Sequence, residues 1–357
     1  METPMNRASV RVAVIGYGVI GKRVADAVAL QEDMQLAGVA DVAIDWRLKV
    51  AASLGLPIFA GDAASADSMR EAGLPVLGVM EDLLKQADVV VDCTPKKVAA
   101  GNVAHYRSAG IRFILQGGEK HELAGHSFVA ESNYEDALGR TATRVVSCNT
   151  TSIVRTLGAL RRAGLLLHAR GTLMRRATDP VDGHRGGLMN TLVPEDKVPS
   201  HQGPDARRVD PALDVVTMAV AVPQTLAHVH CWNVRMTRAA SLDEVLAAFR
   251  TSSRIALLRS SDGLGAINVV KEMMSDLGRP RADLYEVGLW EDLVTLDGDE
   301  LFFTYMVDNQ AIVIPETIDA IRALAGTQPD GPTSIAATNR SLGIPLPAGI
   351  RSGSEVP

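Results

Sequence analysis

The strongest candidate for catalytic chemistry in this sequence is a cysteine at the expected start of a helix. Cys148 follows the strand-like run 143–146 and precedes the helix-like run 152–157. Backbone N–H groups at a helix start have no partner within the helix, and together with the helix dipole they favour a negative charge. The thiolate is the nucleophilic form of cysteine, so this placement predicts a reactive Cys148.

Two histidines could serve this cysteine as a base. His228 and His230 lie two residues apart in a strand-like run, so both are expected on the same face of that strand as Trp232. A base beside a cysteine forms an ion pair with it and supplies the acid–base step of nucleophilic catalysis. We assign this role to His228 and interpret His230 as a structural residue of the core.

The histidines do not predict a metal site. The His-x-His pair has no third ligand motif at short spacing. His121 and His126 flank a segment that resembles H-E-x-x-H, but they are five residues apart where that motif requires four. The cysteines, 3 in number and far apart, do not form a disulfide framework and indicate a reducing compartment.

The N-terminal part carries a dinucleotide-binding fingerprint. Gly16, Gly18 and Gly21 form G-x-G-x-x-G between the buried-strand run 10–16 and the helical run 22–30. In this context the first glycine allows a tight turn and the second allows a pyrophosphate to approach the backbone. The third lets the helix pack on the strand. The alternative is a glycine-rich turn without a ligand.

An acidic residue follows at the spacing that a ribose contact requires. Asp41 closes the next strand, about 20 residues beyond the last glycine, where a carboxylate binds a ribose hydroxyl. Its charge would repel the extra phosphate of NADP, so NAD is the expected cofactor. Arg47 lies close enough in sequence to keep NADP open. The alternative is that Asp41 only caps its strand.

Basic and polar residues in the second half could bind phosphate. Arg175 and Arg176 are adjacent, and guanidinium groups bind phosphate through two parallel hydrogen bonds. The polar loop 199–205 is flanked by prolines and includes His201 and Gln202, which could present donors to the same kind of anion.

The chain of 357 residues is long enough for two domains. Up to about residue 147, short apolar strands alternate with helices, which predicts βαβ units and a parallel sheet. Longer strand-like runs follow, as in a mixed or antiparallel sheet with helices on one side. The predicted fold class is α/β, with a Rossmann dinucleotide-binding domain over 1–147 and an α+β catalytic domain over 148–310. The end, 343–357, is rich in Gly, Pro and Ser and is expected to form a flexible tail.

Composition excludes several classes of protein. A formal net charge of −6 argues against a general nucleic-acid binder, which would usually be basic. No apolar run reaches the ~18–20 residues of a membrane span, and the polar residues 1–10 lack the apolar core of a signal peptide. We therefore expect a soluble, cytoplasmic protein without nucleic-acid or membrane partners.

Together these motifs resemble those of the archaeal-type (type II) phosphorylating glyceraldehyde-3-phosphate dehydrogenases. The resemblance covers about residues 10–342. It is carried by the segments 16–26, 116–120, 147–151, 175–180, 199–201, 226–230 and 278–286.

The resemblance implies oxidation of D-glyceraldehyde 3-phosphate to 1,3-bisphosphoglycerate, with inorganic phosphate and a nicotinamide cofactor, through a thioester. In this reaction Cys148 would be the nucleophile and His228 its base. A homotetramer is also implied, in which the C-terminal helix, about 311–342, returns to the nucleotide domain. The residues expected to bind substrate and phosphate are Ser147, Asn149, Thr150, Arg175, His201 and Gln202. Those expected at the cofactor are Gly16, Gly18, Val19, Ile20, Gly21, Asp41, Thr94, Gly118, Arg176 and Asn309.

Three positions depart from the usual pattern of that family. Asp41 stands where a lysine suited to NADP is usual, which strengthens the expectation of NAD. Gln202 replaces the second of two adjacent histidines in the phosphate loop, and it can donate a hydrogen bond but carries no charge. The segment 308–310 reads Asp-Asn-Gln instead of His-Gln-Glu, so either Asn309 or Gln310 could meet the nicotinamide amide.

Two other functions stay open at this point. One is a related cysteine-dependent aldehyde dehydrogenase that acts on erythrose 4-phosphate or aspartate semialdehyde. The other is a nucleotide-sensing homologue that has kept the fold without the reaction, and the presence of both Cys148 and His228 weighs against it.

Overall fold

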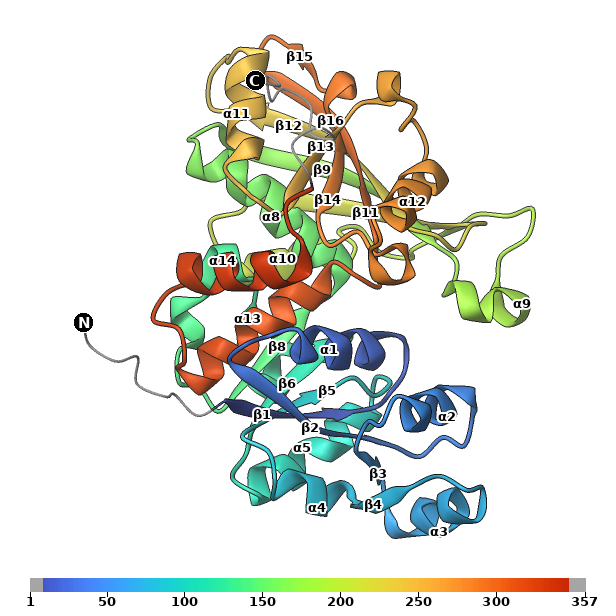
Figure 1. Ribbon diagram of the computed structural model, residues 1–357. Coiled ribbons are helices and arrows are strands. Elements are labelled where there is room, and N and C mark those ends of the chain that lie inside the picture. Colours follow the sequence, from blue (N-terminus) through green and yellow to red (C-terminus); the bar gives the residue numbers. More distant parts are fainter. Residues whose placement is uncertain (1–8, 347–357) are drawn as a thin grey trace. The chain divides into compact units, whose positions relative to one another are not determined.

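Two sheets, one parallel and one mixed, organise the chain (Figure 1). The computed structural model describes residues 9–346, which divide into two compact units. Of these residues, unit 1 comprises 9–146 together with Ile314–Leu342. Unit 2 comprises Ser147–Val313 and 343–346. Among the described residues, none of the helices combines the length and the apolar character that a membrane span requires.

Every strand pairing described in unit 1 is parallel, and the strand order is β4-β3-β2-β1-β5-β6-β8-β7. The strands are β1 (Val10–Ile15), β2 (Met34–Asp41), β3 (Ile58–Ala60), β4 (Val76–Val79), β5 (Val89–Asp92), β6 (Arg112–Gly117), β7 (Ser127–Phe128) and β8 (Ala142–Val146). The helices are α1 (Val19–Ala29), α2 (Trp46–Ser53), α3 (Ala63–Glu71), α4 (Met80–Leu84), α5 (Val98–Ser108), α6 (His121–Ala124), α7 (Ala130–Asn133), α13 (Val313–Ala325) and α14 (Gly331–Leu342).

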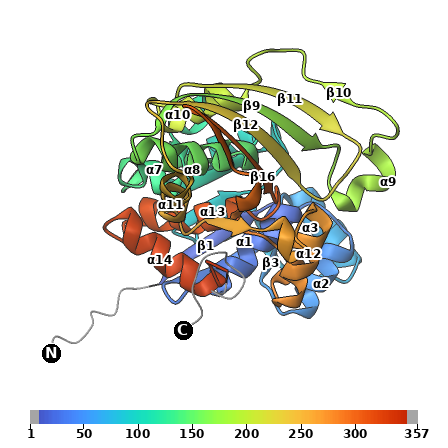
Figure 2. The same ribbon diagram turned by 90° about the horizontal axis from the view of Figure 1, so that it is seen from above.

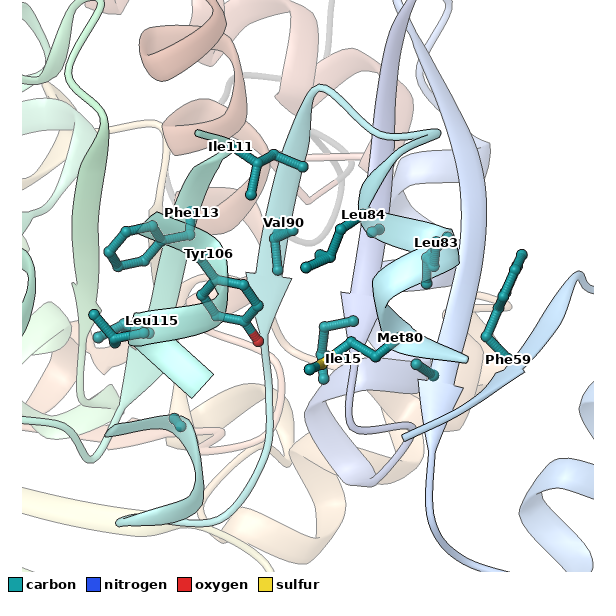
Figure 3. Close-up of a cluster of buried hydrophobic side chains, with 14 of the residues drawn as sticks. Ile15, Phe59, Met80, Leu83, Leu84, Val90, Tyr106, Ile111, Phe113 and Leu115 are labelled. Carbon is teal, nitrogen blue, oxygen red and sulfur yellow. The ribbon is translucent and has the colours of Figure 1, made fainter. Parts of the chain in front are cut away.

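Helices cover both faces of this sheet. Helices α1 and α13 lie on one face, and α4 and α5 lie on the other (Figure 1). Figure 3 shows the core on the second face, where Ile15, Val90 and Phe113 from the strands join Leu83 and Tyr106 from the helices. Central strands that are buried on both faces read as continuous apolar runs, which is why the parallel sheet could be predicted.

The strand order of unit 1 reverses between β1 and β5. In an open α/β sheet, ligands bind outside the carboxyl ends of the strands at such a reversal. Gly16 follows β1, Asp41 ends β2, and Thr94 and Gly118 lie just beyond β5 and β6. The topology thus collects these four predicted cofactor residues at one edge of the sheet.

Unit 2 has a mixed sheet with the order β10-β11-β9-β12-β16-β14-β13, and β15 pairs with β16. The strands are β9 (Leu166–Arg176), β10 (Val193–Pro194), β11 (Val215–Val222), β12 (His228–Met236), β13 (Ile255–Leu258), β14 (Val287–Trp290), β15 (Thr295–Asp297) and β16 (Glu300–Val307). The helices are α8 (Cys148–Arg162), α9 (Gly183–Gly186), α10 (Gln202–Val209), α11 (Leu242–Arg250) and α12 (Ile267–Asp276). The predicted fold class, a Rossmann-type domain and a domain with a mixed sheet, is confirmed.

Helix α8 is the central helix of unit 2. It packs against β9, β14 and β16 and has α10 and α11 beside it (Figure 2). Arg155, in the middle of α8, is fully buried and donates to the backbone oxygens of Tyr285 and Ile312 at 2.8 and 3.1 Å. The helix that begins with Cys148 is therefore held to both of these neighbouring segments by polar contacts.

The segment 343–346, expected to begin a flexible tail, is packed instead. Ile344 and Leu346 are buried, and Leu346 joins an apolar cluster with Leu284 and Met306. Arg279 donates to the backbone oxygen of Gly343 at 2.7 Å. The high content of Gly, Pro and Ser suggested a loose tail, but apolar side chains at alternate positions anchor its start. The remaining part of that prediction, 347–357, lies outside the described residues.

Candidate functional site

The predicted helix start at Cys148 is confirmed. Ser147 is the N-cap of α8, and its Oγ accepts a hydrogen bond from the backbone N–H of Thr150 at 3.3 Å. The same Oγ lies 2.9 Å from the hydroxyl oxygen of Thr150. No acidic residue occupies the first turn, so nothing there offsets the preference of a helix N-terminus for negative charge.

The environment of Cys148 nevertheless disfavours its thiolate. Burial raises the pKa of the Cys148 thiol to about 11, although the charges of Arg176 and Arg175 and a hydrogen bond from the Asn149 backbone act in the opposite direction. Our expectation of an easily formed thiolate is therefore wrong for this structure, because desolvation outweighs the helix start. At neutral pH the side chain is a thiol.

His228 lies on the same unit, next to the end of β9. Its Nδ1 accepts a hydrogen bond from the backbone N–H of Arg176 at 3.0 Å. Burial is the largest cause that holds the pKa of His228 well below its usual range. Electrostatic interactions with His230 and Arg176 lower the pKa further. A neutral imidazole that accepts at Nδ1 carries its proton on Nε2. His228 thus presents a donor at Nε2, and among the described residues no hydrogen bond joins it to Cys148.

His230 positions the neighbour of the cysteine. Its ring is fully buried, and burial lowers its pKa to about 3, so the ring is neutral. Its Nδ1 lies 2.9 Å from the hydroxyl of Tyr305 and its Nε2 lies 2.8 Å from Oδ1 of Asn149. Because a carbonyl oxygen only accepts, Nε2 is the donor, and the Asn149 amide is fixed by its oxygen. The Nδ2 donors of Asn149 have no partner in the described part of the chain.

The period-two prediction for β12 is confirmed. The buried and partly exposed positions alternate along the strand, so His228, His230 and Trp232 share its buried face. The contact between His230 and Asn149 was not predicted from the sequence. That contact joins residues 81 positions apart, and no local pattern encodes it.

The two arginines at the end of β9 lie near these groups. Arg176 pairs with Asp179 at 2.7 Å through Nη2, while its Nε and Nη1 are buried without a hydrogen-bond partner. Arg175 pairs with Glu195 through Nη1, and its Nε is likewise buried without a partner. Each guanidinium therefore retains N–H groups that an anion could use.

The predicted phosphate loop leads into α10 and is anchored to β11. Ser200 donates its hydroxyl to Oγ1 of Thr217 at 2.8 Å, and the backbone N–H of Gly203 donates to the same oxygen at 3.0 Å. These two bonds bracket His201 and Gln202 and hold the loop against the sheet.

Glu195, which belongs to none of the motifs of the sequence, is the common partner of this region. Besides Arg175, its carboxylate contacts Nε2 of the fully buried Gln202 at 3.5 Å. Nδ1 of the exposed His201 lies 3.6 Å from its other oxygen. The predicted phosphate residues Arg175, His201 and Gln202 are thus brought together around one carboxylate.

The segment 308–310 lies in unit 2, and its two amides differ. Gln310 donates its side-chain amide to Asp179. Asn309 is 7% exposed, and its Oδ1 is buried without a hydrogen-bond partner. Of the two candidates for a nicotinamide amide, Asn309 is the one whose acceptor is buried without a partner.

In unit 1, the glycine-rich turn has the geometry that its motif requires. Gly16 has φ +86°, and a Cβ there would lie 2.9 Å from the backbone nitrogen of Thr94. A Cβ at Gly21 would lie 1.9 Å from the oxygen of Gly16, so the helix could not pack so closely. Helix α1 has Gly18 as its N-cap, with no side-chain cap and no acidic residue in the first turn, which contains Val19 and Ile20. Such a terminus is suited to an anion such as a pyrophosphate.

Asp41 does more than end its strand. Its carboxylate accepts the backbone N–H groups of Tyr17, in the glycine-rich turn, and of Val42 and Ala43, at 2.7, 2.7 and 2.9 Å. A carboxylate has about four lone-pair sites, so a ribose hydroxyl could still be accommodated. Arg47 approaches the same turn, since a Cβ at Gly18 would lie 3.7 Å from its Nη1.

Thr94 and Gly118 complete this edge of the sheet. Thr94 donates both its backbone N–H and its hydroxyl to Oδ1 of Asp92, at 2.9 and 2.6 Å. Asp92 is fully buried and also accepts from Tyr106 at 2.7 Å. Gly118 is exposed, with nothing closer to a hypothetical Cβ than the Lys96 side chain at 3.8 Å. The predicted residues Arg176 and Asn309 belong to unit 2, as described above.

The described residues contain no group of three or more His, Cys, Asp or Glu side chains that could hold a metal ion. The three cysteines are unpaired.

Family profiles match both units. The profile of the glyceraldehyde 3-phosphate dehydrogenase C-terminal domain matches residues 147–276, from the N-cap of α8 to the end of α12. The profile of the dihydrodipicolinate reductase N-terminus matches residues 10–122, within the parallel sheet of unit 1.

Curated relatives extend the similarity over nearly the whole chain. The glyceraldehyde-3-phosphate dehydrogenase of Pyrobaculum calidifontis is 45% identical over 336 residues, 93% of this chain and 97% of that protein. That of Methanobrevibacter smithii is 43% identical over 335 residues, 93% of this chain and 99% of that protein. Glyceraldehyde-3-phosphate dehydrogenase 2 of Methanosarcina barkeri is 42% identical over 337 residues, 94% and 99% of the two chains. This level of identity spans both units, and the chain belongs to the archaeal-type glyceraldehyde-3-phosphate dehydrogenase family.

Proposed function

We propose that this chain oxidises D-glyceraldehyde 3-phosphate to 1,3-bisphosphoglycerate, with inorganic phosphate and a nicotinamide cofactor. The observation that carries the proposal is the arrangement in unit 2, where Cys148 begins α8 beside an amide fixed by His230. The arginine pair at the end of β9 acts electrostatically on the same thiol. Membership of the family supports the same reaction.

In the first step, the Cys148 thiol adds to the aldehyde. A sulfur–carbon bond forms, and the thiol proton ends on the substrate oxygen. Donors for the charge that develops on this oxygen are the backbone N–H groups at the start of α8 and Nδ2 of Asn149. We assign His228 a donor role at Nε2 in this step. The backbone N–H of Arg176 donates to Nδ1, so the proton of the neutral ring is on Nε2. This disfavours the role of a base, which was predicted from the sequence. Ser147 and Thr150 shape the substrate side of the first turn.

In the following steps, the substrate carbon loses a hydride and the substrate oxygen loses its proton to solvent water, and a thioester remains on Cys148. The nicotinamide cofactor, when bound, supplies the hydride acceptor. A phosphate oxygen then attacks the thioester carbon, the carbon–sulfur bond breaks, and a proton returns to the sulfur. Arg175, His201 and Gln202 are the proposed ligands of the phosphate group, because all three converge on the carboxylate of Glu195.

Each unit, taken by itself, has a feature that suits one part of a nicotinamide dinucleotide. The uncapped start of α1 and the cradle formed by Gly16 and Gly21 suit a pyrophosphate. The unpartnered Oδ1 of Asn309 suits a carboxamide N–H group. We propose NAD as the preferred cofactor because of the carboxylate of Asp41, while Arg47 keeps NADP as a second cofactor.

We also propose a homotetramer in the cytoplasm. The sheet of unit 2 carries a hollow of about 400 Å³ whose lining includes Thr172, Val216, Met218 and Phe302. The side chains of Met218 and Phe302 are exposed, and exposed apolar patches on a sheet are typical of subunit interfaces. The three unpaired cysteines suit a reducing compartment, and recovery of the protein from a membrane or secreted fraction would contradict it.

The proposed reaction predicts phosphate-dependent NADH formation. The protein should reduce NAD in the presence of glyceraldehyde 3-phosphate, and turnover should require inorganic phosphate. Cys148→Ser should lower kcat at least ~10³-fold, because the nucleophile is lost. Cys231→Ser, a change to an unpaired cysteine in the middle of β12, should retain most activity. Turnover by Cys148→Ser at the wild-type rate would refute Cys148 as the nucleophile. Faster turnover of erythrose 4-phosphate or aspartate semialdehyde would show that glyceraldehyde 3-phosphate is not the preferred substrate.

The donor role of His228 predicts different effects for two replacements. A glutamine amide can still donate near the position of Nε2 but cannot exchange a proton, whereas alanine provides neither. Steady-state kcat should fall less than about tenfold in His228→Gln and about 10²–10³-fold in His228→Ala, the range typical of a lost oxyanion donor. Equal losses in the two variants would instead establish His228 as a general base.

The carboxylate of Asp41 predicts cofactor preference. Asp41→Asn keeps an acceptor for the Tyr17 backbone but removes the charge that repels the extra phosphate of NADP. The ratio of kcat/KM for NADP to that for NAD should rise about tenfold, while Arg47→Gln should lower it. An unchanged ratio of kcat/KM in Asp41→Asn would contradict a role of Asp41 in cofactor preference.

The exposed sheet face of unit 2 predicts the oligomeric state. Light scattering should give four times the chain mass of 37.9 kDa. Phe302→Glu together with Met218→Glu should lower the measured mass, because two buried charges would oppose association. A monomeric wild-type protein would contradict the proposal.

A further inference from the structure

We propose that Glu195 occupies the anion-binding region of unit 2 as an internal competitor of the phosphate group, and thereby sets the affinity for it. This inference rests on the proposed function, because it concerns the phosphate that the reaction uses. The carboxylate contacts the three side chains to which phosphate binding was assigned, Arg175, His201 and Gln202. A carboxylate and a phosphate present the same acceptor chemistry to a guanidinium group, so the two cannot use the same N–H groups at once.

Arg175 bonds to Glu195 through only one of its nitrogens, so a phosphate group could displace the carboxylate. Only Nη1 of Arg175 bonds to the carboxylate, and Nε is buried without a partner. The side chains of Arg175 and Glu195 are 35% and 23% exposed. A second anion could therefore approach the guanidinium from the accessible side and replace a single bond by two.

A structural ion pair in the same unit shows the contrast. Arg279 and Glu286 are 7% and 0% exposed, and Nη1 and Nη2 of the arginine bond to the two carboxylate oxygens at 2.6 and 2.8 Å. Nη2 of Arg279 also donates to the Gly343 backbone. The Arg279–Glu286 pair is buried and uses two nitrogens, as expected of an ion pair that stabilises the fold. The Arg175–Glu195 pair is partly exposed and uses one nitrogen.

Gln202, which contacts Glu195, and Arg176, the sequence neighbour of Arg175, both carry buried polar atoms without a hydrogen-bond partner. Gln202 is fully buried and its Oε1 has no hydrogen-bond partner. Nε and Nη1 of Arg176 are also buried without a partner. Buried polar atoms normally have partners, so these orphans argue for an additional group with both acceptor and donor atoms. A hydrogen phosphate has oxygens that accept from the arginines and a hydroxyl that donates to Oε1 of Gln202.

Two arginines in this region are each neutralised by a carboxylate of the chain itself. Asp179 pairs with Arg176, as Glu195 does with Arg175. Asp179 lies three residues from Arg176 and also accepts from Gln310, so it belongs to a local network. Glu195 lies 20 positions from Arg175, just beyond the short strand β10. A change at Glu195 therefore alters the charge of the anion site with little effect on the turn that holds Asp179.

The test compares two charge-neutralising variants of adjacent residues. Glu195→Gln removes the competing charge at nearly constant shape, and Asp196→Asn makes the same change at an exposed side chain one residue further on. Binding of inorganic phosphate is measured by titration calorimetry on the full chain with NAD present. We expect the dissociation constant to fall about two- to fivefold in Glu195→Gln, the size of a partly exposed ion pair, and to stay unchanged in Asp196→Asn.

Two kinetic arms identify the source of the phosphate group. If Glu195→Gln lowers only the KM for inorganic phosphate, the site binds the attacking phosphate. If it lowers only the KM for glyceraldehyde 3-phosphate, the site binds the phosphate group of the substrate. Either result, together with tighter binding, supports the inference. A dissociation constant that is unchanged or raised in Glu195→Gln overturns it, and so does the same shift in Asp196→Asn.

The inference and the proposed function can fail separately. If the wild-type protein did not oxidise glyceraldehyde 3-phosphate, the proposed function would be wrong, while calorimetry would still report whether Glu195 limits phosphate binding. If the oxidation occurred and Glu195→Gln bound phosphate no more tightly, only the inference would be wrong. Glu195→Ala serves as a second variant, and both replacements should shift the affinity in the same direction.

Discussion

A single hydrogen bond between buried neutral groups, from Nε2 of His230 to Oδ1 of Asn149, underlies the candidate site. It joins the second residue of α8 to the third residue of β12. Removing one partner would leave the other buried and unsatisfied, at a cost of about 1–3 kcal/mol. The bond from the Arg176 backbone to His228 adds β9 to the same assembly. The proposed nucleophile and amide donor, the imidazoles and the arginines are thus positioned by the framework of one unit.

Features encoded by neighbouring residues could be predicted from the sequence. The helix start at Cys148 follows from a polar cap between an apolar strand and a helix, and the glycine-rich turn follows from the spacing of Gly16 and Gly21. The shared face of His228 and His230 follows from the alternation of a strand. The parallel sheet follows from alternating apolar strands and helices, and the comparison with relatives agrees with it.

Features that depend on distant partners could not be predicted. The pKa of Cys148 is set mainly by burial, which the order of residues around it does not reveal. The proton position on His228 depends on a backbone N–H group 52 residues away. The place of Glu195 depends on the fold, because β10 and the loop before α10 bring its carboxylate to Arg175 and Gln202. Motif searching finds residues of a recognised type, whereas an internal counter-charge belongs to no motif.

The carboxylate of Asp41 couples two properties that are usually treated as separable. It is the residue proposed to discriminate between cofactors, and it also accepts the peptide N–H groups of Tyr17, Val42 and Ala43. A side chain without an acceptor at this position would therefore disturb the anchoring of the loop that is proposed to cradle the dinucleotide. Redesign of coenzyme choice in this chain would require a compensating acceptor for those amides, so an evolutionary switch at this position would proceed through paired substitutions.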